Sequence, residues 1–218
     1  MWSEIFRKLG PSGVKTRSIL MTPANIPELS AIWGEEFCLS GPAELLYASQ
    51  QVRLLALDPA LRNSGYAILE KAGSKVRAVN YGVIRNKAEL SMPGCLVEIH
   101  RHIEELIRLH SPEECAVEGL IYVQNTRTAI TLGAARGSAL LAAAQHGLPI
   151  YEYPPRRVKQ AVVGRGGAQK AQIGYMVRTL LGLTETPEAD AADALAIGLT
   201  HFQMHSSPLA ALRGNHRL

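Results

Sequence analysis

The feature that most constrains the fold is a continuous apolar run, Leu54-Leu55-Ala56-Leu57, which stops at Asp58-Pro59. A strand with one face in solvent alternates apolar and polar residues, whereas a strand covered on both faces is apolar throughout. A shorter run of the same kind, Cys115-Ala116-Val117, stops at Glu118. We therefore expect two central strands, in a sheet that is covered on both faces.

The segments around these runs predict the order of the remaining elements. Short connections separate the first run from strands at 66–69 and 76–85, which predicts an antiparallel meander. A last strand is expected at 149–153. Helices are expected in five segments: residues 96–107, 125–146, 156–163, 168–181 and 188–200. This order predicts an α/β fold, with a five-stranded mixed sheet and helices on both faces.

The ends of the chain differ from its middle. Residues 1–50 show only weak, isolated helical signals, so we expect an N-terminal extension that is helical or poorly ordered, unless Met21 is the true start. One folded domain is expected over 51–205, followed by a tail at 206–218. The three cysteines lack CxxC spacing, which is typical of a reducing compartment. No signal peptide and no apolar stretch of about 20 residues is present, so we expect a cytoplasmic protein without membrane contact.

Four acidic residues mark the candidate site. Asp58 and Glu118 each follow an apolar run, and active-site residues of open sheets tend to lie just beyond strand ends. Asp190 and Asp193 are three residues apart, so they share one face of the first turn of a helix, which supplies no Lys or Arg at i+3 or i+4. The alternative is structural: a helix N-terminus favours acids by about 0.3–1 kcal/mol each, and Asp58 and Glu118 suit a turn and a strand end.

Taken together, the four acids favour a metal site. Clustered carboxylates raise one another's pKa values unless a cation is present. Mg²⁺ prefers such oxygen ligands together with substrate phosphate. Two ions about 3.5–4 Å apart can activate water and stabilise the leaving oxygen in phosphoryl displacement. We therefore expect a metal site that is suited to phosphoryl displacement.

A basic stretch lies between the second and third of these positions. Residues 153–184 contain no acid and six basic residues: Arg156, Arg157, Lys159, Arg165, Lys170 and Arg178. Such residues neutralise nucleic-acid phosphates, and the glycines at 164, 166 and 167 permit close backbone approach. A net charge of +4 also permits a polyanionic partner. The alternative is a solvated charged face. The glycine loop is not a nucleotide-binding P-loop, because no Gly-Lys-Ser/Thr follows it.

Several motifs carry a resemblance to a known family. They are LDPALRNSGY at 57–66, AVE at 116–118, GAARG at 133–137, VKQAVVG at 158–164 and ADAADALA at 189–196. In this order they resemble the bacterial RuvC Holliday-junction endonucleases, over roughly residues 53–205. The last two motifs are the most specific to that family.

The resemblance implies a ribonuclease H-like fold and a homodimer that nicks four-way junction DNA symmetrically, leaving 5′-phosphate and 3′-hydroxyl ends. It implies two Mg²⁺ ions, with Mn²⁺ as a possible substitute, and a branch-migration helicase complex as partner. The metal-binding catalytic residues would be Asp58, Glu118, Asp190 and Asp193. Lys159 and Lys170 match family lysines near the DNA and the scissile phosphate, and Lys170 would help to neutralise the developing charge. The helix at 125–146, with Arg136, would form the dimer interface; packing inside the domain is the alternative.

The sequence departs from the family pattern at several positions. Ala60 and Ser64 stand where the family usually has Gly and Thr. Ile121 stands where an aromatic residue usually stacks on a base, so the neighbouring Tyr122 is the candidate for DNA contact. Two rival functions therefore stay open. One is a ribonuclease H-like nuclease acting on RNA or another branched DNA, and the other is a DNA-binding protein with a lapsed active site.

Overall fold

The computed structural model describes residues 51–119, 125–167, 169–205 and 217–218. The chain divides into two units, Met1–Glu44 and Leu45–Leu218, and all described residues belong to the second. The extension expected at 1–50 lies outside the described residues, as does the tail up to residue 216. The described residues thus cover almost all of the predicted folded domain.

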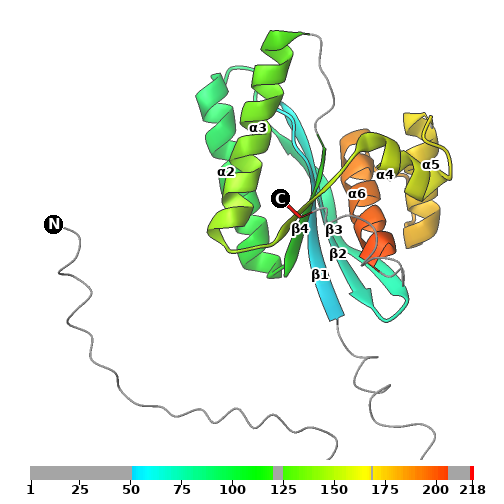
Figure 1. The fold of residues 1–218 in the computed structure, drawn as a ribbon. Helices are drawn as coiled ribbons and strands as arrows, with labels where there is room; N and C mark the ends of the chain where they lie inside the picture. Colours follow the sequence, from blue (N-terminus) through cyan, green and yellow to red (C-terminus); the bar gives the residue numbers. More distant parts are fainter. Residues whose placement is uncertain (1–50, 120–124, 168, 206–216) are drawn as a thin grey trace, which may run out of the picture. The chain divides into compact units, whose positions relative to one another are not determined.

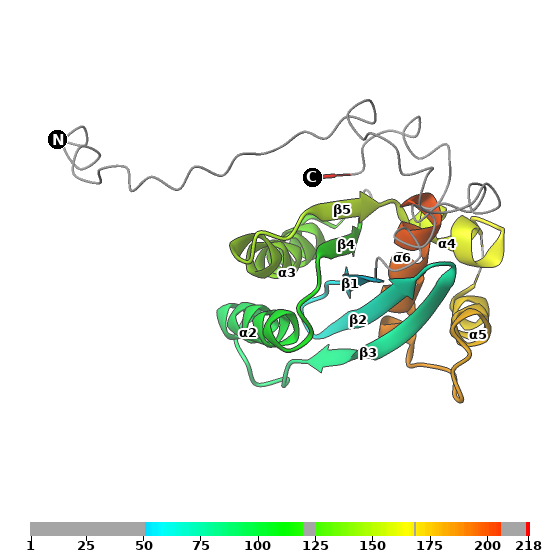
Figure 2. The same ribbon diagram turned by 90° about the horizontal axis from the view of Figure 1, so that it is seen from below.

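Five strands form one mixed sheet in the order β3-β2-β1-β4-β5 (Figures 1 and 2). Neighbouring strands from β3 to β1 run antiparallel, whereas β4 runs parallel to both β1 and β5. Their bounds are Gln51–Asp58 (β1), Asn63–Ala72 (β2), Lys75–Arg85 (β3), Glu114–Glu118 (β4) and Ile150–Tyr153 (β5). The predicted meander and mixed sheet are confirmed.

Helices cover both faces of this sheet. Figure 1 shows α2 and α3 on one face and α4, α5 and α6 on the other. Their bounds are Met92–His110 (α2), Thr126–Gln145 (α3), Pro155–Val163 (α4), Lys170–Leu181 (α5) and Ala189–His205 (α6). Each predicted helix is found, although α6 continues five residues past the predicted end at Thr200. Among the described helices, none combines the length and the apolar character that a membrane crossing requires.

The apolar run in β1 is buried from both sides, as the sequence predicts. Residues 54–57 are at most 1% exposed. Leu54 and Ala56 pack in a cluster with side chains of α4, α5 and α6, whereas Leu55 and Leu57 pack with side chains of α2 and α3. Because successive side chains of a strand point to opposite faces, four apolar residues supply both cores.

Two glycines let α6 lie close against the sheet. A Cβ atom added to Gly198 would lie 2.3 Å from Leu69 Cδ1. A Cβ atom added to Gly65 would lie only 1.9 Å from the backbone oxygen of Asp190, at the start of the helix. Gly65 pairs with Asp58 across β1 and β2, so this contact brings the first turn of α6 to the end of β1.

A buried hydrogen-bonded set holds the other end of α6. His201 is 1% exposed, its Nε2 lies 2.7 Å from a carboxylate oxygen of Glu114, and its Nδ1 lies 2.9 Å from the hydroxyl of Tyr153. A carboxylate can only accept, so Nε2 carries the proton and Nδ1 accepts from the tyrosine. Burial lowers the pKa of His201, and its hydrogen bond lowers the pKa of Glu114. A neutral imidazole thus joins α6 to β4 and β5.

The close contact at Gly65 yields a prediction. Gly65→Ala should lower the free energy of unfolding by about 1–3 kcal/mol, because the new methyl group meets backbone rather than a flexible side chain. Urea denaturation measures this. Gly167→Ala is the control, since nothing lies within 4 Å of the added atom there. Equal stability of the two variants would contradict the proposed packing constraint.

Candidate active site

Three of the four predicted acids come together at one end of the sheet. Asp58 is the last residue of β1, and Asp190 and Asp193 lie at the start of α6. One carboxylate oxygen from each lies within 4.8 Å of the other two, and all three side chains are partly buried. The spacing of the two α6 aspartates accounts for their common direction, and the Gly65 contact accounts for their approach to Asp58.

Glu118, the fourth predicted acid, is the last residue of β4, the strand beside β1. Its carboxylate is not part of the three-residue cluster, but it lies near enough to interact with it. Burial, and then the charges of Asp58 and Asp193, raise the pKa of Glu118 to about 7. Glu118 therefore borders the cluster at the adjacent strand end.

The electrostatics of these acids are those of crowded, partly dehydrated carboxylates. Burial raises the pKa of Asp58 to about 6, and repulsion by Asp193 and Asp190 adds to the effect. Burial also raises the pKa of Asp193. Each negative charge is therefore costly without a cation nearby. Hard carboxylate oxygens at this spacing suit a divalent ion such as Mg²⁺, so the cluster can hold a metal.

Basic partners reach the cluster from other helices, although α6 itself supplies none. Lys170, the first residue of α5, places its Nζ 3.4 Å from a carboxylate oxygen of Asp193. The charge of Asp193 raises the pKa of this lysine, whose side chain is 71% exposed. Lys159, on α4, lowers the pKa values of both Glu118 and Asp193. Both predicted lysines thus lie beside the acids.

The remaining predicted DNA-contacting residues lie beside or outside this group. Arg156 and Arg157 are in the first turn of α4, and Arg165 is in the loop that follows the helix. The Arg156 side chain packs against Gly166, where an added Cβ atom would lie 2.8 Å from Arg156 Cγ. Tyr122 lies outside the described residues, as does Ile121.

The structure accommodates both departures from the family pattern in the first motif, Ala60 and Ser64. The Ser64 hydroxyl donates to the Ala60 carbonyl oxygen at 2.6 Å and accepts from the Ala60 N–H at 3.1 Å. Among the described residues other than glycine, only Ser111 has a positive φ, so Ala60 needs no glycine-like freedom. The turn after Asp58 is therefore closed by a side-chain hydroxyl.

Arg136 lies inside the domain. The residue is 7% exposed, and its guanidinium donates to the backbone oxygen of Glu118 and pairs with the carboxylate of Glu152. Of the two places considered for Arg136, the structure thus shows packing within the domain. Neither this contact nor the role of Gly65 was predicted, since both join residues distant in sequence.

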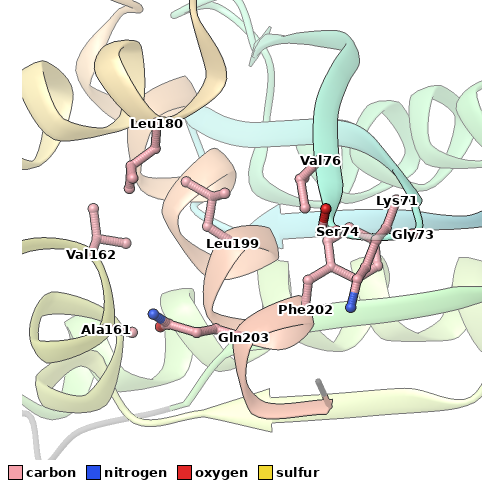
Figure 3. Close-up of a pocket in the computed structure, with 10 residues that line it drawn as sticks. All are labelled: Lys71, Gly73, Ser74, Val76, Ala161, Val162, Leu180, Leu199, Phe202 and Gln203. Atoms are coloured by element: carbon pink, nitrogen blue, oxygen red, sulfur yellow. The ribbon is translucent and has the colours of Figure 1, made fainter. Parts of the chain in front are cut away.

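A groove of about 720 Å³ lies elsewhere, between α4, α5, α6 and the β2–β3 hairpin (Figure 3). Val162, Leu180, Leu199 and Phe202 supply apolar walls, and the Lys71 ammonium lies 5.9 Å from the centre of the Phe202 ring. Among the described residues that line this groove, none carries a carboxylate. It therefore lacks the ligands that a hard metal ion needs, and the acid cluster remains the candidate for chemistry.

Comparisons with known proteins identify the family. Residues 54–201 match the model of a family described as crossover junction endodeoxyribonuclease RuvC. The chain belongs to the RuvC family. A curated RuvC from Akkermansia muciniphila is 53% identical over 160 residues, which are 73% of this chain and 95% of that protein. A RuvC from Desulfitobacterium hafniense is 49% identical over 149 residues, covering 68% and 90%.

Solved structures agree with the family assignment. The chain is similar to Thermus thermophilus RuvC in complex with a Holliday junction substrate, with a TM-score of 0.65 and 34% identity over 69% of this chain and 93% of that one. The yeast mitochondrial Holliday junction resolvase Ydc2 shares the fold at 15% identity, with a TM-score of 0.52 over 79% and 91%. The predicted RuvC resemblance and the ribonuclease H-like fold are confirmed.

The raised pKa of Asp58 yields a prediction. With metal chelated at pH 8, Asp58→Asn should raise the free energy of unfolding by roughly 2 kcal/mol, because it removes a buried, repelled charge. The folded-state pKa lies above the unfolded one, so the cost to wild type is full above about pH 6. It should fade as the pH falls below 6 and vanish at about pH 3, below the unfolded-state pKa of 3.8, where the carboxyl is protonated in both states. Chemical denaturation across this range measures the difference. Glu89→Gln, at an exposed position, serves as the control. If Asp58→Asn is no more stable than wild type at pH 8, the charge repulsion at Asp58 is wrong.

Proposed function

We propose that this RuvC-family protein resolves Holliday junctions as a homodimer by symmetrical, Mg²⁺-dependent nicking of DNA. The products would carry 5′-phosphate and 3′-hydroxyl ends. The observation that carries the proposal is the meeting of Asp58, Asp190 and Asp193 within 4.8 Å in a chain that belongs to an endonuclease family. Relatives named crossover junction endodeoxyribonuclease support the same reaction class.

The acids would hold the metal ions that the reaction needs. Asp58 offers an oxygen ligand from the end of β1, Asp190 and Asp193 offer two from the start of α6, and Glu118 offers a fourth from the next strand end. When bound, a pair of Mg²⁺ ions, or of Mn²⁺ in their place, would lower the pKa of an attacking water and stabilise the leaving oxygen. The protein's part is to fix these carboxylates before DNA arrives, since a site prepared in this way needs little rearrangement during reaction.

The lysines would orient and neutralise the scissile phosphate. Lys170 is exposed beyond its contact with Asp193, so its ammonium can turn from that carboxylate to a phosphate oxygen. Lys159 adds positive charge from α4. Arg156, Arg157 and Arg165 would bind flanking phosphates, and Tyr122 would contact bases at the junction centre.

A homodimer would place two such sites on the paired strands of one junction. The helix α3 offers a surface for this contact: Ile130 and Leu141 are 63% and 53% exposed, and Gly133 and Gly137 have open space beside them. Small residues let helices approach closely, which favours packing against a second copy. We further propose action in the cytoplasm together with a branch-migration helicase complex.

The decisive experiment is cleavage of a synthetic four-way junction in Mg²⁺ by wild type and by Asp190→Asn. We expect paired nicks from wild type and roughly a 100-fold or greater loss in the variant, because a metal ligand contributes several kcal/mol at the transition state. Denaturing gels measure the rate, and a binding assay in Ca²⁺ checks that the variant still binds the junction.

Glu185→Gln is the matched control, since Glu185 is an exposed acid just before α6. The same panel should contain RNA–DNA hybrids and other branched DNA. Preference for one of those substrates would favour a related nuclease. Junction binding without any nicks from wild type would favour a protein with a lapsed site.

The basic surface yields a separate prediction. Arg156→Ala should weaken junction binding and reduce the slope of log affinity against log salt concentration by about 0.7–0.9, as expected for one lost phosphate contact. Fluorescence anisotropy at salt concentrations from about 50 to 200 mM measures this slope, because affinities that depend on phosphate contacts change strongly over that range. The control is Arg101→Ala, because Arg101 pairs with Glu98 and Glu105 along α2. An unchanged slope for Arg156→Ala would remove this arginine from the DNA surface.

A further inference from the structure

The peptide unit that follows Glu118 is held at both of its polar atoms. The N–H of Gly119 donates to the backbone oxygen of Tyr153 at 2.8 Å. The backbone oxygen of Glu118 accepts from Arg136 Nη1 at 3.1 Å. One bond comes from the neighbouring strand β5, and the other comes from a side chain of α3. This peptide unit therefore cannot rotate without breaking a hydrogen bond.

The arginine bond occurs where the sheet no longer fixes the strand on that side. The parallel pairing of β1 and β4 ends at Leu57 and Val117, one residue before Glu118. At this strand end β5 still pairs with Glu118, whereas on the β1 side no strand pairing restrains the backbone torsions that set the side-chain direction. Arg136 thus supplies to the Glu118 carbonyl a donor that the adjoining strand no longer offers.

Arg136 is itself fixed in place. Its side chain is 9% exposed, and its second terminal nitrogen pairs with the carboxylate of Glu152 on β5. A planar guanidinium that bonds two partners has little freedom to swing away. Glu152 in turn lies against the same peptide, because a Cβ atom at Gly119 would be 3.1 Å from its Oε1. Helix, strand end and edge strand are joined through one side chain.

The contact acts on geometry rather than on the charge of the Glu118 carboxylate. The charges that shift the pKa of Glu118 are those of Asp58, Asp193, Lys159 and Lys170. Arg136 is neutralised by Glu152 and touches the backbone of Glu118, not its carboxylate. A positioning role and an electrostatic role are therefore separable by experiment.

We propose that Arg136 is a positioning residue for Glu118: it fixes the backbone at the end of β4, so that the carboxylate stays directed at the acid cluster. The proposal rests on the proposed metal-dependent function of that cluster. It also gives a buried arginine of the GAARG motif a task in metal binding, carried out from α3 across the sheet end.

The test measures the Mg²⁺ affinity of the full chain in two ways: by thermal denaturation without DNA, and by the Mg²⁺ dependence of junction cleavage. Arg136→Lys keeps a positive charge beside Glu152, but it cannot bond both partners as a guanidinium does. We expect its apparent Mg²⁺ dissociation constant, from the rise of melting temperature with Mg²⁺ concentration, to increase about 10-fold, as for other supports of metal ligands. The Mg²⁺ concentration for half-maximal junction cleavage should increase similarly, while the KM for junction DNA stays unchanged.

Glu70→Gln is the matched control for a purely structural effect. Glu70 is also buried and bonded to two arginines, Arg53 and Arg77, but it lies in β2 away from the acids. This variant should lose stability and keep wild-type Mg²⁺ affinity. If Arg136→Lys also keeps that affinity, the positioning role is wrong. If Arg136→Lys does not fold, Arg136→Met, which keeps the aliphatic length, is measured against the same two outcomes.

The two proposals fail in different ways. Wild type that gains stability with Mg²⁺ but cuts no junction would overturn the proposed function, and the affinities of the Arg136 variants would still be decisive. Wild type that cuts junctions, beside an Arg136→Lys protein with unaltered Mg²⁺ affinity and unaltered cleavage, would overturn only the positioning role.

Discussion

The close approach of α6 to the sheet is the contact on which the site depends. A helix that lay one methyl group further from β2 would carry Asp190 and Asp193 away from Asp58. The contact needs glycine at two places, Gly198 against Leu69 and Gly65 against the backbone of Asp190. Hydrophobic burial along α6 supplies the attraction, since Leu195 and Ile197 are fully buried. The glycines determine how close the helix can come.

The close approach of the α6 aspartates to Asp58 is opposed by electrostatic repulsion. The same packing that brings three carboxylates within 4.8 Å also removes water from them, and the raised pKa values of Asp58 and Glu118 express this cost. Lys170 and Lys159 offset part of it from α5 and α4. Functional sites commonly retain such strain because the surrounding fold is stable enough to tolerate it. The apolar cores on both sides of β1 provide that stability here.

Much of this arrangement could be predicted from the sequence, because its signals are local. The run at 54–57 indicates a strand covered on both faces, and the spacing of Asp190 and Asp193 indicates one helix face. The contacts that determine the distances are not local. Gly65 meets Asp190, and Arg136 meets Glu118, across long stretches of chain. A glycine in a strand and an arginine in an alanine-rich helix carry no signal of their partners. The family resemblance places Lys170 at the site, but its contact with Asp193 was not predicted, because it joins two different helices rather than neighbouring turns of one.

The buried hydrogen bonds of Tyr153 have a consequence for how the acids hold their separation. Its backbone oxygen accepts from Gly119, next to Glu118, and its hydroxyl bonds His201 on the helix that carries Asp190 and Asp193. Tyr153 is thus bonded both to α6 and to the residue that follows β4, the two elements that carry Glu118 and the α6 aspartates. Its side chain is fully buried, so neither of these bonds is open to competition from bulk water. The position of Glu118 relative to the two α6 aspartates therefore depends on one residue of β5 that carries no charge.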